Sequence, residues 1–297
     1  MIKNTQSEGL GVLKGGWASY NNNLSVRAEV YLDLSWLDSW LSEVKCMNIG
    51  KVGQPFFYPD TLIEMLAMLK AKGFSFRELN GLLRSLSKRL GGFPVISFSQ
   101  IRRRINSLEL TFPKVNSDSV IAVDGTGLKV SNRGEWIRHK WKVRRGWVKV
   151  VLAGTTKGDI VDLEVGDETF DEVRVARGMI KRIDCSEVLL DGLHDTYETY
   201  NVCEAKSVKL RTPARKGSNP KGLNPRSRAV REQLFLGRDE WSKKTGYGKR
   251  WVGSEGIFSA VKTLFGETLT GHKTKFLKHE AKLKFWAYQN LRDAIKI

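Results

Sequence analysis

The chain contains few of the residues that build disulfide frameworks or zinc sites. Its 297 residues include three cysteines and four histidines, and no two cysteines form a CxxC pair. This scarcity argues against a disulfide-stabilised domain and against a structural zinc site. No apolar run approaches the roughly 20 residues that a membrane-spanning helix needs, and the first residues lack the charged-then-apolar order of a signal peptide. The sequence therefore predicts a cytoplasmic protein with no membrane partner.

Acidic residues are also scarce relative to basic ones. Lys and Arg number 50 against 32 Asp and Glu, which gives a formal net charge of +18. Such an excess predicts attraction to a polyanion, most simply nucleic acid. The hydrophobic content of 41% is typical of an ordinary packed core, so a basic but otherwise ordinary soluble enzyme is the alternative.

Three carboxylates stand out against this basic background. Asp124 and Asp191 each end a short apolar run that predicts a buried strand, and we expect these two strands to be neighbours. Glu255 opens an amphipathic helix, and Lys262 follows seven residues later near the same helical face, within reach of phosphate. Carboxylate oxygens are the ligands that Mg²⁺ prefers, and two such ions can serve the cutting and joining of a phosphodiester.

The segment before these strands is predicted to be helical. Residues 1–55 form an N-terminal arm, and helical periodicity with start signals covers residues 56–112. The last predicted helix of that region carries Arg102, Arg103 and Arg104. Short helices that end in an Arg-rich one are typical of a helix-turn-helix DNA reader. A small helical bundle with a solvated basic face is the alternative.

The periodicity changes to that of an α/β domain over residues 113–297. The predicted order is a strand, a β-hairpin, a helix, a strand, a helix and a strand, which implies a mixed sheet flanked by helices. The predicted hairpin strands are 147–154 and 160–165. A basic Gly/Pro/Asn loop then opens an insertion at about 212–246, and two helices are predicted to close the chain.

Two basic segments of this domain are predicted to contact DNA. Residues 136–147 interleave tryptophans with cations, and exposed aromatics of this kind stack on unpaired bases. The same tryptophans can equally face the core of an amphipathic hairpin. The cations of the segment are Arg138, Lys140, Lys142, Arg144 and Arg145. The insertion adds Arg215 and Lys216, and we expect the affinity for DNA to fall steeply with salt.

Four sets of residues carry a resemblance to a known family. They are Val123-Asp124-Gly125-Thr126, Leu190 to Thr196, the set Tyr247, Arg250, Glu255 and Lys262, and the helical region from Tyr58 to Arg104. They resemble, in that order, the first-Asp strand, the second-Asp motif, the Tyr-Arg-Glu-Lys signature and the N-terminal region of DDE transposases of the insertion-sequence-five type.

The resemblance implies an RNase-H-like catalytic core preceded by a small all-α DNA-binding region. It implies metal-dependent cleavage and strand transfer at the inverted-repeat ends of an insertion sequence, with Asp124, Asp191 and Glu255 holding Mg²⁺ or Mn²⁺, two ions in all. Arg250 and Tyr247 join Lys262 as predicted DNA contacts. The implied partner is double-stranded DNA, as element ends and as target, so we expect the protein to be associated with the nucleoid. Because two DNA ends must be joined, the mechanism also predicts a homodimer in the active complex.

Two departures from the family pattern are visible. Four residues separate Arg250 from Glu255 where the family has three, and His194 stands where the family usually has an aromatic residue. Asp195, next to His194, is interpreted as a helix N-cap, with an accessory carboxylate as the alternative. Two other functions stay open: an RNase-H-like nuclease that does not join strands, and a catalytically dead DNA-binding regulator.

Overall fold

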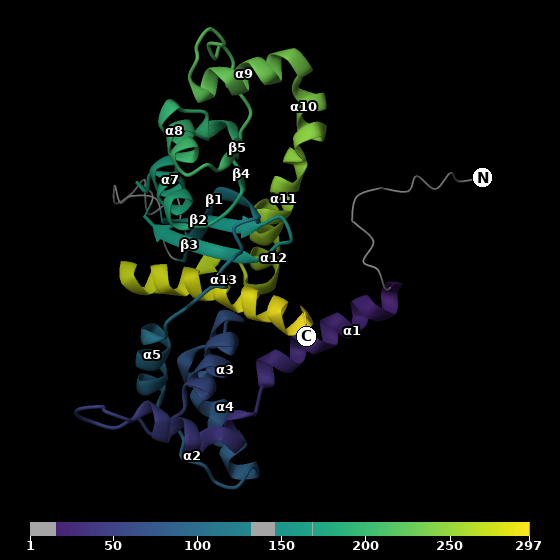
Figure 1. The fold of residues 1–297 in the computed structure, drawn as a ribbon. Coiled ribbons are helices and arrows are strands. Elements are labelled where there is room, and N and C mark those ends of the chain that lie inside the picture. The colour runs from purple at the N-terminus through teal and green to yellow at the C-terminus, as the bar shows by residue number, and fades with distance from the viewer. Residues whose placement is uncertain (1–15, 132–145, 168, 297) are drawn as a thin grey trace. The chain divides into compact units, whose positions relative to one another are not determined.

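The computed structural model describes residues 16–131, 146–167 and 169–296 (Figure 1). The chain divides into two compact units, residues 1–65 with 290–297 and residues 66–289. The domain boundaries expected from the sequence stay predictions. Within the described ranges, no helix has the length and apolar character that crossing a membrane requires.

The first unit is helical. Its elements are α1 (Gly16–Glu29), the short 3₁₀ helix η1 (Val30–Leu32), α2 (Trp36–Met47) and the start of α3 (Asp60–Ala71). The Trp36 side chain is fully buried, and its ring centroid lies 5.7 Å from that of Trp40, which in turn packs on Tyr58 at 5.9 Å. Aromatic packing therefore joins α2 to the segment that leads into α3.

The second unit opens with two helices whose starts are visible in the sequence. These are α4 (Phe76–Arg89) and α5 (Phe98–Ser107). Ser75 and Ser97 begin them with capping boxes, in which each serine hydroxyl accepts from the third helical N–H and that residue's side chain returns to the serine N–H.

A mixed sheet forms the centre of the second unit. Its strands are β1 (Val120–Val130), β2 (Trp147–Thr155), β3 (Ile160–Gly166), β4 (Glu187–Leu189), β5 (Lys209–Arg211) and β6 (Thr268–Leu269). The order is β3-β2-β1-β4-β5, with β6 pairing on β1. Strand β1 runs antiparallel to β2 and parallel to β4 and β6, and β4 is parallel to β5. The predicted fold class, an RNase-H-like mixed sheet flanked by helices, is confirmed.

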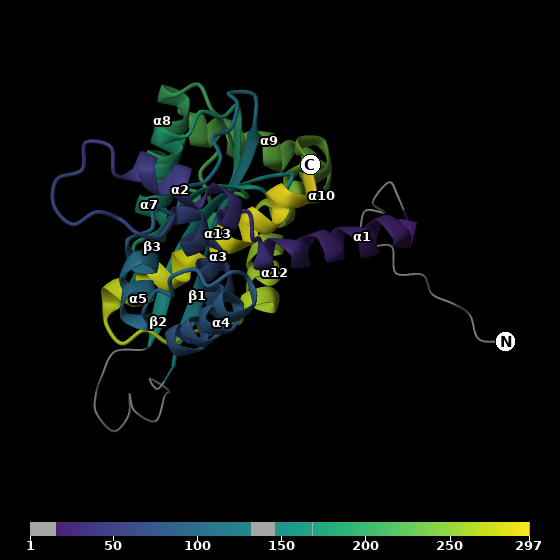
Figure 2. The same cartoon turned by 90° about the horizontal axis from the view of Figure 1, so that it is seen from below.

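Helices cover both faces of this sheet (Figure 1). The helical elements after the hairpin are α7 (Glu172–Arg182), η2 (Gly192–His194), α8 (Tyr197–Ala205), α9 (Pro225–Leu236), α10 (Arg238–Thr245), η3 (Tyr247–Lys249), α11 (Arg250–Gly253), α12 (Glu255–Phe265) and α13 (Thr274–Lys296). On the α7 face, Val123 and Val151 pack with Met179 in the apolar core, which also buries Cys185 and Cys203. The opposite face carries α11 and α12, and Figure 2 shows α13 passing across the strands.

The basic insertion contains more regular structure than its composition suggests. The predicted loop is present up to Asn224, but α9 and α10 occupy most of the remainder. Asn224 accepts from the N–H of Ser227, and Pro225 occupies the first turn of α9. Proline is well suited to a first helical turn because its missing N–H would have no intrahelical partner there. A proline that suggested a loop is therefore a helix start.

A partly buried histidine makes the stability of this unit depend on pH. His279 Nε2 lies 2.7 Å from the carbonyl oxygen of Ile105 on α5, and burial lowers the pKa of His279. The unfolded chain therefore binds more protons near pH 6, so stability falls as the pH drops through about 6.5. We expect His279→Gln, which keeps an N–H donor but does not titrate, to lose less unfolding free energy than the wild type between pH 8 and pH 5.

The measurement is urea denaturation across that pH range. His279→Gln removes one partly buried titrating group, whereas the same substitution at exposed His272 serves as the matched control and should leave the pH profile unchanged. Equal pH profiles for His279→Gln and the wild type would contradict the prediction.

Candidate active site

Asp124 lies in the middle of a strand. The run 120–123 predicted that Asp124 ends the strand, and this is wrong, because β1 continues to Val130 and Asp124 pairs with Leu152 of β2. Strand β2 supplies partners as far as Lys129, so the ladder continues past the acid. The length of a strand depends on the length of the strand it pairs with, and the residues 120–123 contain no information about that partner.

The parallel pairing of β1 with β4 brings the two aspartates together. Its register places Ala122 opposite Leu189, and two residues further along each chain (122 + 2 and 189 + 2) come Asp124 and Asp191. The prediction that these two strands are neighbours is confirmed. The side chain of Asp191 is 40% exposed and that of Asp124 is 15% exposed, so both acids are within reach of solvent.

The backbone that carries Asp191 is held from two sides. The hydroxyl of Thr212 donates to the carbonyl oxygen of Asp191 at 2.6 Å, and the Tyr247 hydroxyl donates to that of Leu190 at 2.9 Å. The Asp191 carboxylate itself accepts from the N–H of Leu193 at 2.9 Å. Tyr247, predicted to contact DNA, therefore fixes the strand end that leads into Asp191.

Arg250 joins the first and third acids. Its Nη1 donates to Oδ2 of Asp124 at 2.6 Å, and its Nη2 donates to Oε1 of Glu255 at 2.5 Å. Two carboxylates far apart in the sequence thus face one cation. The arginine side chain is only 17% exposed, so the pair with Asp124 is stronger than a pair in open water.

Two glycines allow α11 to approach the sheet closely enough for this contact. A Cβ on Gly253 would lie 2.9 Å from the Cβ of Ala122, and a Cβ on Gly154 would lie 2.2 Å from the carbonyl oxygen of Gly253. No side chain fits between α11 and the β1–β2 pair. Arg250 and Glu255 flank this contact, on the face of β1 to which Ala122 and Asp124 both point.

A break between two helices absorbs the extra residue between Arg250 and Glu255. Helix α11 ends at Gly253, α12 begins at Glu255, and Ser254 between them has φ −138° and ψ −74°, outside the helical region. The Ser254 hydroxyl donates to the carbonyl oxygen of Arg250 at 3.0 Å. The four-residue separation is therefore compatible with direct contact between Arg250 and Glu255.

A fourth carboxylate, Glu172, was not identified from the sequence. It is the first residue of α7, and a Cβ on Gly125 would lie only 2.4 Å from its carboxyl carbon. Burial raises the pKa of Glu172, and the negative charges of Asp124 and Asp191 raise it further. Two features of the sequence could have pointed to Glu172: the glycine directly after the first aspartate, and an acid in the first turn of the helix that follows the hairpin.

His194 is packed beneath the second aspartate. Its side chain is fully buried, with Nε2 3.7 Å from Oδ1 of Asp191. Burial lowers the pKa of His194, and within the described residues neither ring nitrogen has a hydrogen-bond partner. His194 therefore fills the position that an aromatic ring would fill.

Asp195 does not cap a helix, so that interpretation is wrong. Thr196 caps α8, and the fully buried Asp195 carboxylate pairs with Arg226, whose Nε and Nη2 donate at 2.7 and 2.8 Å. The N–H of Arg215 and the hydroxyl of Ser218 also donate to it, each at 2.8 Å. Asp195 thus ties the basic insertion to the segment that follows Asp191.

The remaining predicted DNA contacts lie in different settings. On α5, Arg102 and Arg103 are exposed and Arg104 is partly buried; Lys216 is exposed. Arg215 donates to the carbonyl oxygens of Gly192 and Leu193, so its guanidinium serves the fold. These residues keep their DNA-binding roles as predictions, and Arg138, Lys140, Lys142, Arg144 and Arg145 lie outside the described residues.

Two further residues that were predicted to contact DNA, Lys262 and Trp147, are partly buried and exposed, respectively. Lys262 on α12 is partly buried, and its charge lowers the pKa of Glu267, whose main partner is Lys129. The sequence did not decide whether Trp147 faces the core or the surface, and in the structure its side chain is 40% exposed. Trp136 and Trp141, the other tryptophans of that segment, lie outside the described residues.

The donor set suits a divalent metal ion in its chemistry. Asp124 and Glu255 converge on one positive charge, Asp191 is adjacent by register, and all the donors are oxygens, which Mg²⁺ and Mn²⁺ prefer. In the part of the chain that the structure describes, no three Asp, Glu, His or Cys side chains form a ready metal-ligating group. Asp124, Asp191 and Glu255 are the residues that would hold such an ion, and Arg250 now pairs with two of them.

A comparison with protein families agrees with the resemblance over part of the chain. Residues 26–133 match a family model described as Transposase DDE domain, a segment that includes Asp124 but neither Asp191 nor Glu255. Among solved structures, the Drosophila P element transposase strand transfer complex is similar at 10% identity, covering 88% of this chain and 86% of that chain, with a TM-score of 0.33.

A second solved structure is the simian T-cell lymphotropic virus intasome in complex with PP2A regulatory subunit B56 gamma. It is similar at 11% identity, and the match covers 65% of this chain and 66% of that chain, with a TM-score of 0.24. Both TM-scores are too low to support an argument about this chain. The family match supports a transposase function, and the resemblance to DDE transposases is confirmed by that match over residues 26–133.

Proposed function

We propose that this chain is a DNA transposase that cleaves the ends of an insertion sequence and joins them to target DNA. The observation that carries the proposal is the pair of contacts from Arg250 to Asp124 and Glu255, beside the strand end that carries Asp191. Asp124 and Glu255 come from distant segments to one guanidinium, and Asp191 follows the neighbouring strand, in a chain of net charge +18.

The protein residues would act by position and charge. Asp124, Asp191 and Glu255 would hold the divalent cations, which, when bound, would supply positive charge for the attacking and leaving oxygens of the phosphodiester. Arg250, released from the carboxylates, is placed to neutralise a phosphate, and Lys262 lies further along α12. Tyr247 and Thr212 keep Asp191 in place through the backbone. Phosphoryl transfer needs mainly such positioning and charge stabilisation.

A strand-transfer assay tests the proposal against its two alternatives. The purified chain, Mg²⁺ or Mn²⁺, a DNA fragment carrying the inverted repeats that flank its coding sequence and a supercoiled target plasmid are incubated together. Joined product supports a transposase. Cleaved fragment without joined product indicates a nuclease, and metal-independent binding without cleavage indicates a regulator; either result would overturn the proposal.

The proposed reaction also implies an oligomeric state and a cellular location for the protein. Joining two element ends to one target requires two active sites to act together, so we propose a homodimer on paired ends, with the protein bound to the DNA of the nucleoid. Light scattering with and without the end fragment measures the assembly, and a complex with one protein chain per pair of ends would contradict it.

Arg250→Met should increase the response to metal. Without metal, the variant loses hydrogen bonds from a charged group to two carboxylates, each worth about 1.5–3 kcal/mol, so it should unfold more easily. Added Mn²⁺ should then raise its melting temperature more than that of the wild type, because the guanidinium no longer competes for Asp124 and Glu255.

Thermal denaturation in EDTA and in Mn²⁺ measures the difference. Arg228→Met is the matched control, since Arg228 pairs with Glu204 at an exposed site where both side chains are more than half exposed. An equal or smaller metal response in Arg250→Met would show that the arginine and the metal do not share ligands.

A further inference from the structure

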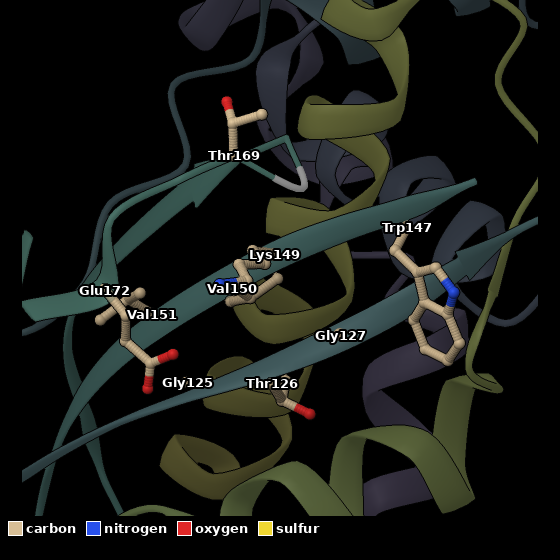
Figure 3. Close-up of a pocket in the computed structure, with 9 residues that line it drawn as sticks. All are labelled: Gly125, Thr126, Gly127, Trp147, Lys149, Val150, Val151, Thr169 and Glu172. Atoms are coloured by element: carbon tan, nitrogen blue, oxygen red, sulfur yellow. The ribbon is translucent and has the colours of Figure 1, made fainter. Parts of the chain in front are cut away.

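A hollow on the α7 face of the sheet has no part in the function proposed above. It is a cavity of about 600 Å³, floored by β1 and β2 and open to one side, with Gly125, Gly127 and Lys149 among its lining residues (Figure 3). Gly125 directly follows Asp124 on β1, so it faces the side of the sheet opposite the Asp124 carboxylate.

The floor is flat because two side chains are missing from it. Gly125 and Gly127 are two apart on β1 and point to the same face. A Cβ on Gly127 would lie 2.8 Å from the indole of Trp147, and a Cβ on Gly125 would lie 2.4 Å from the carboxyl carbon of Glu172. An indole and a carboxylate therefore occupy the two ends of a bare backbone floor, as Figure 3 shows.

The walls combine an aromatic ring with positive charge. Trp147 keeps 40% of its surface exposed, although it is a large aromatic residue on a central strand of the unit. The ammonium group of Lys129 lies 5.9 Å from the centroid of its ring. Lys149 lines the hollow and lowers the pKa of Glu172, against the larger opposite effect of burial. Aromatic rings flanked by cations are typical of sites that bind single-stranded nucleic acid.

We propose that this hollow receives one unpaired base of the DNA strand being processed. The base stacks on Trp147, its exocyclic amino group donates to the carboxylate of Glu172, and Lys149 and Lys129 face the flanking phosphates. The inference rests on the proposed function, because it takes DNA as the substrate. It adds a binding site whose ligand is a nucleobase that carries an amino group.

A base fits the chemistry of the hollow better than other ligands. The volume of the hollow lies within the range of about 300–1,000 Å³ that small-molecule sites occupy. The indole of Trp147 at one end and the carboxylate of Glu172 at the other suit a planar heterocycle with a polar edge. A carboxylate accepts the amino group of cytosine. The hollow lies on the face of β1 opposite the Asp124 side chain, but its Glu172 end is close enough to Asp124 for the two charges to interact. The base would therefore belong to a nucleotide near the cleaved phosphate, where strand ends are easily unpaired.

The experiment compares two duplexes with short single-stranded 3′ overhangs. One overhang carries cytosines, and the other has the same backbone with abasic sites. Binding of the full chain is measured by fluorescence anisotropy in EDTA, so that no strand is cut. The wild type should bind the cytosine overhang more tightly, by on the order of 10-fold. Trp147→Ala should remove this preference, and Trp147→Phe should retain most of it.

Two further variants complete the design. Trp17→Ala is the matched control, because Trp17 is 80% exposed and lies on α1, and it should keep the full preference. Glu172→Gln should reduce the advantage of cytosine over a thymine overhang, since thymine lacks the amino group. An unchanged cytosine preference in Trp147→Ala would overturn the proposal.

Failure of the pocket and failure of the transposase are distinguishable. The overhang measurement needs neither metal nor cleavage, whereas strand transfer needs both. A Trp147-dependent preference with no joined product would leave the base site standing without the transposase. Joined product from a chain that does not distinguish the two overhangs would leave the transposase standing without the base site.

Discussion

Asp124→Asn should abolish cleavage and joining of DNA while leaving DNA binding unchanged. The substitution keeps the shape of the side chain and removes the charge that meets Arg250 at 2.6 Å in this structure. Loss of a charged group at the reacting centre typically costs on the order of 10³-fold in rate or more. The measurement is the strand-transfer assay, with binding to the same end fragment followed by gel shift.

Asp118→Asn is the matched control for this result. Asp118 precedes the same strand and is exposed, and its backbone oxygen, not its side chain, accepts from Ser186. It should cleave and join as the wild type does. Full activity in Asp124→Asn would contradict the proposed mechanism, because Asp124 is the acid that Arg250 joins to Glu255.

Asp195→Ala should cause the largest loss of stability. Its carboxylate is fully buried, pairs with Arg226 at 2.7 Å and accepts from the Arg215 N–H and from Ser218. Removing one partner of a buried pair leaves the other charge uncompensated, which costs about 3–5 kcal/mol. Urea denaturation measures the loss, and limited proteolysis should show earlier cleavage in the loop around Ser218.

Glu204→Ala separates this effect from that of an ordinary ion pair. Glu204 pairs with Arg228 where both side chains are more than half exposed, and surface pairs contribute about 1 kcal/mol or less. Similar losses in the two variants would contradict the buried-pair argument.

Burial raises the pKa of Asp195, but hydrogen bonds from Arg226, Arg215 and Ser218 outweigh it and lower the pKa overall. Its stabilisation is therefore lost as the pH falls through that lowered pKa.

Features that depend on neighbouring residues were predictable. The serines that begin α4 and α5 and the hairpin of β2 and β3 follow from short-range signals. The adjacency of β1 and β4 followed from the order of elements, because a parallel pair needs a crossover and the hairpin and α7 supply one. Local steric and hydrogen-bonding preferences are sufficient for each of these features.

Features that depend on contacts between distant segments were not predictable. The length of β1 depends on β2, the start of α9 at Pro225 depends on packing after the loop, and the role of Asp195 depends on Arg226. Glu172 escaped notice because its place beside Asp124 depends on the missing side chain of Gly125. Residue type and spacing contain no information about such close approaches.

The sequence by itself determined that this is a basic α/β chain with acids on two neighbouring strands and a third acid on a helix, since charge and periodicity are properties of residue order. Only the tertiary structure decided that Arg250 contacts both Asp124 and Glu255, and that Glu172 and a glycine-floored hollow lie beside Gly125 on the other face of β1. The physical reason is close packing: Gly154 and Gly253 let α11 touch the sheet, and Gly125 leaves room for a carboxylate.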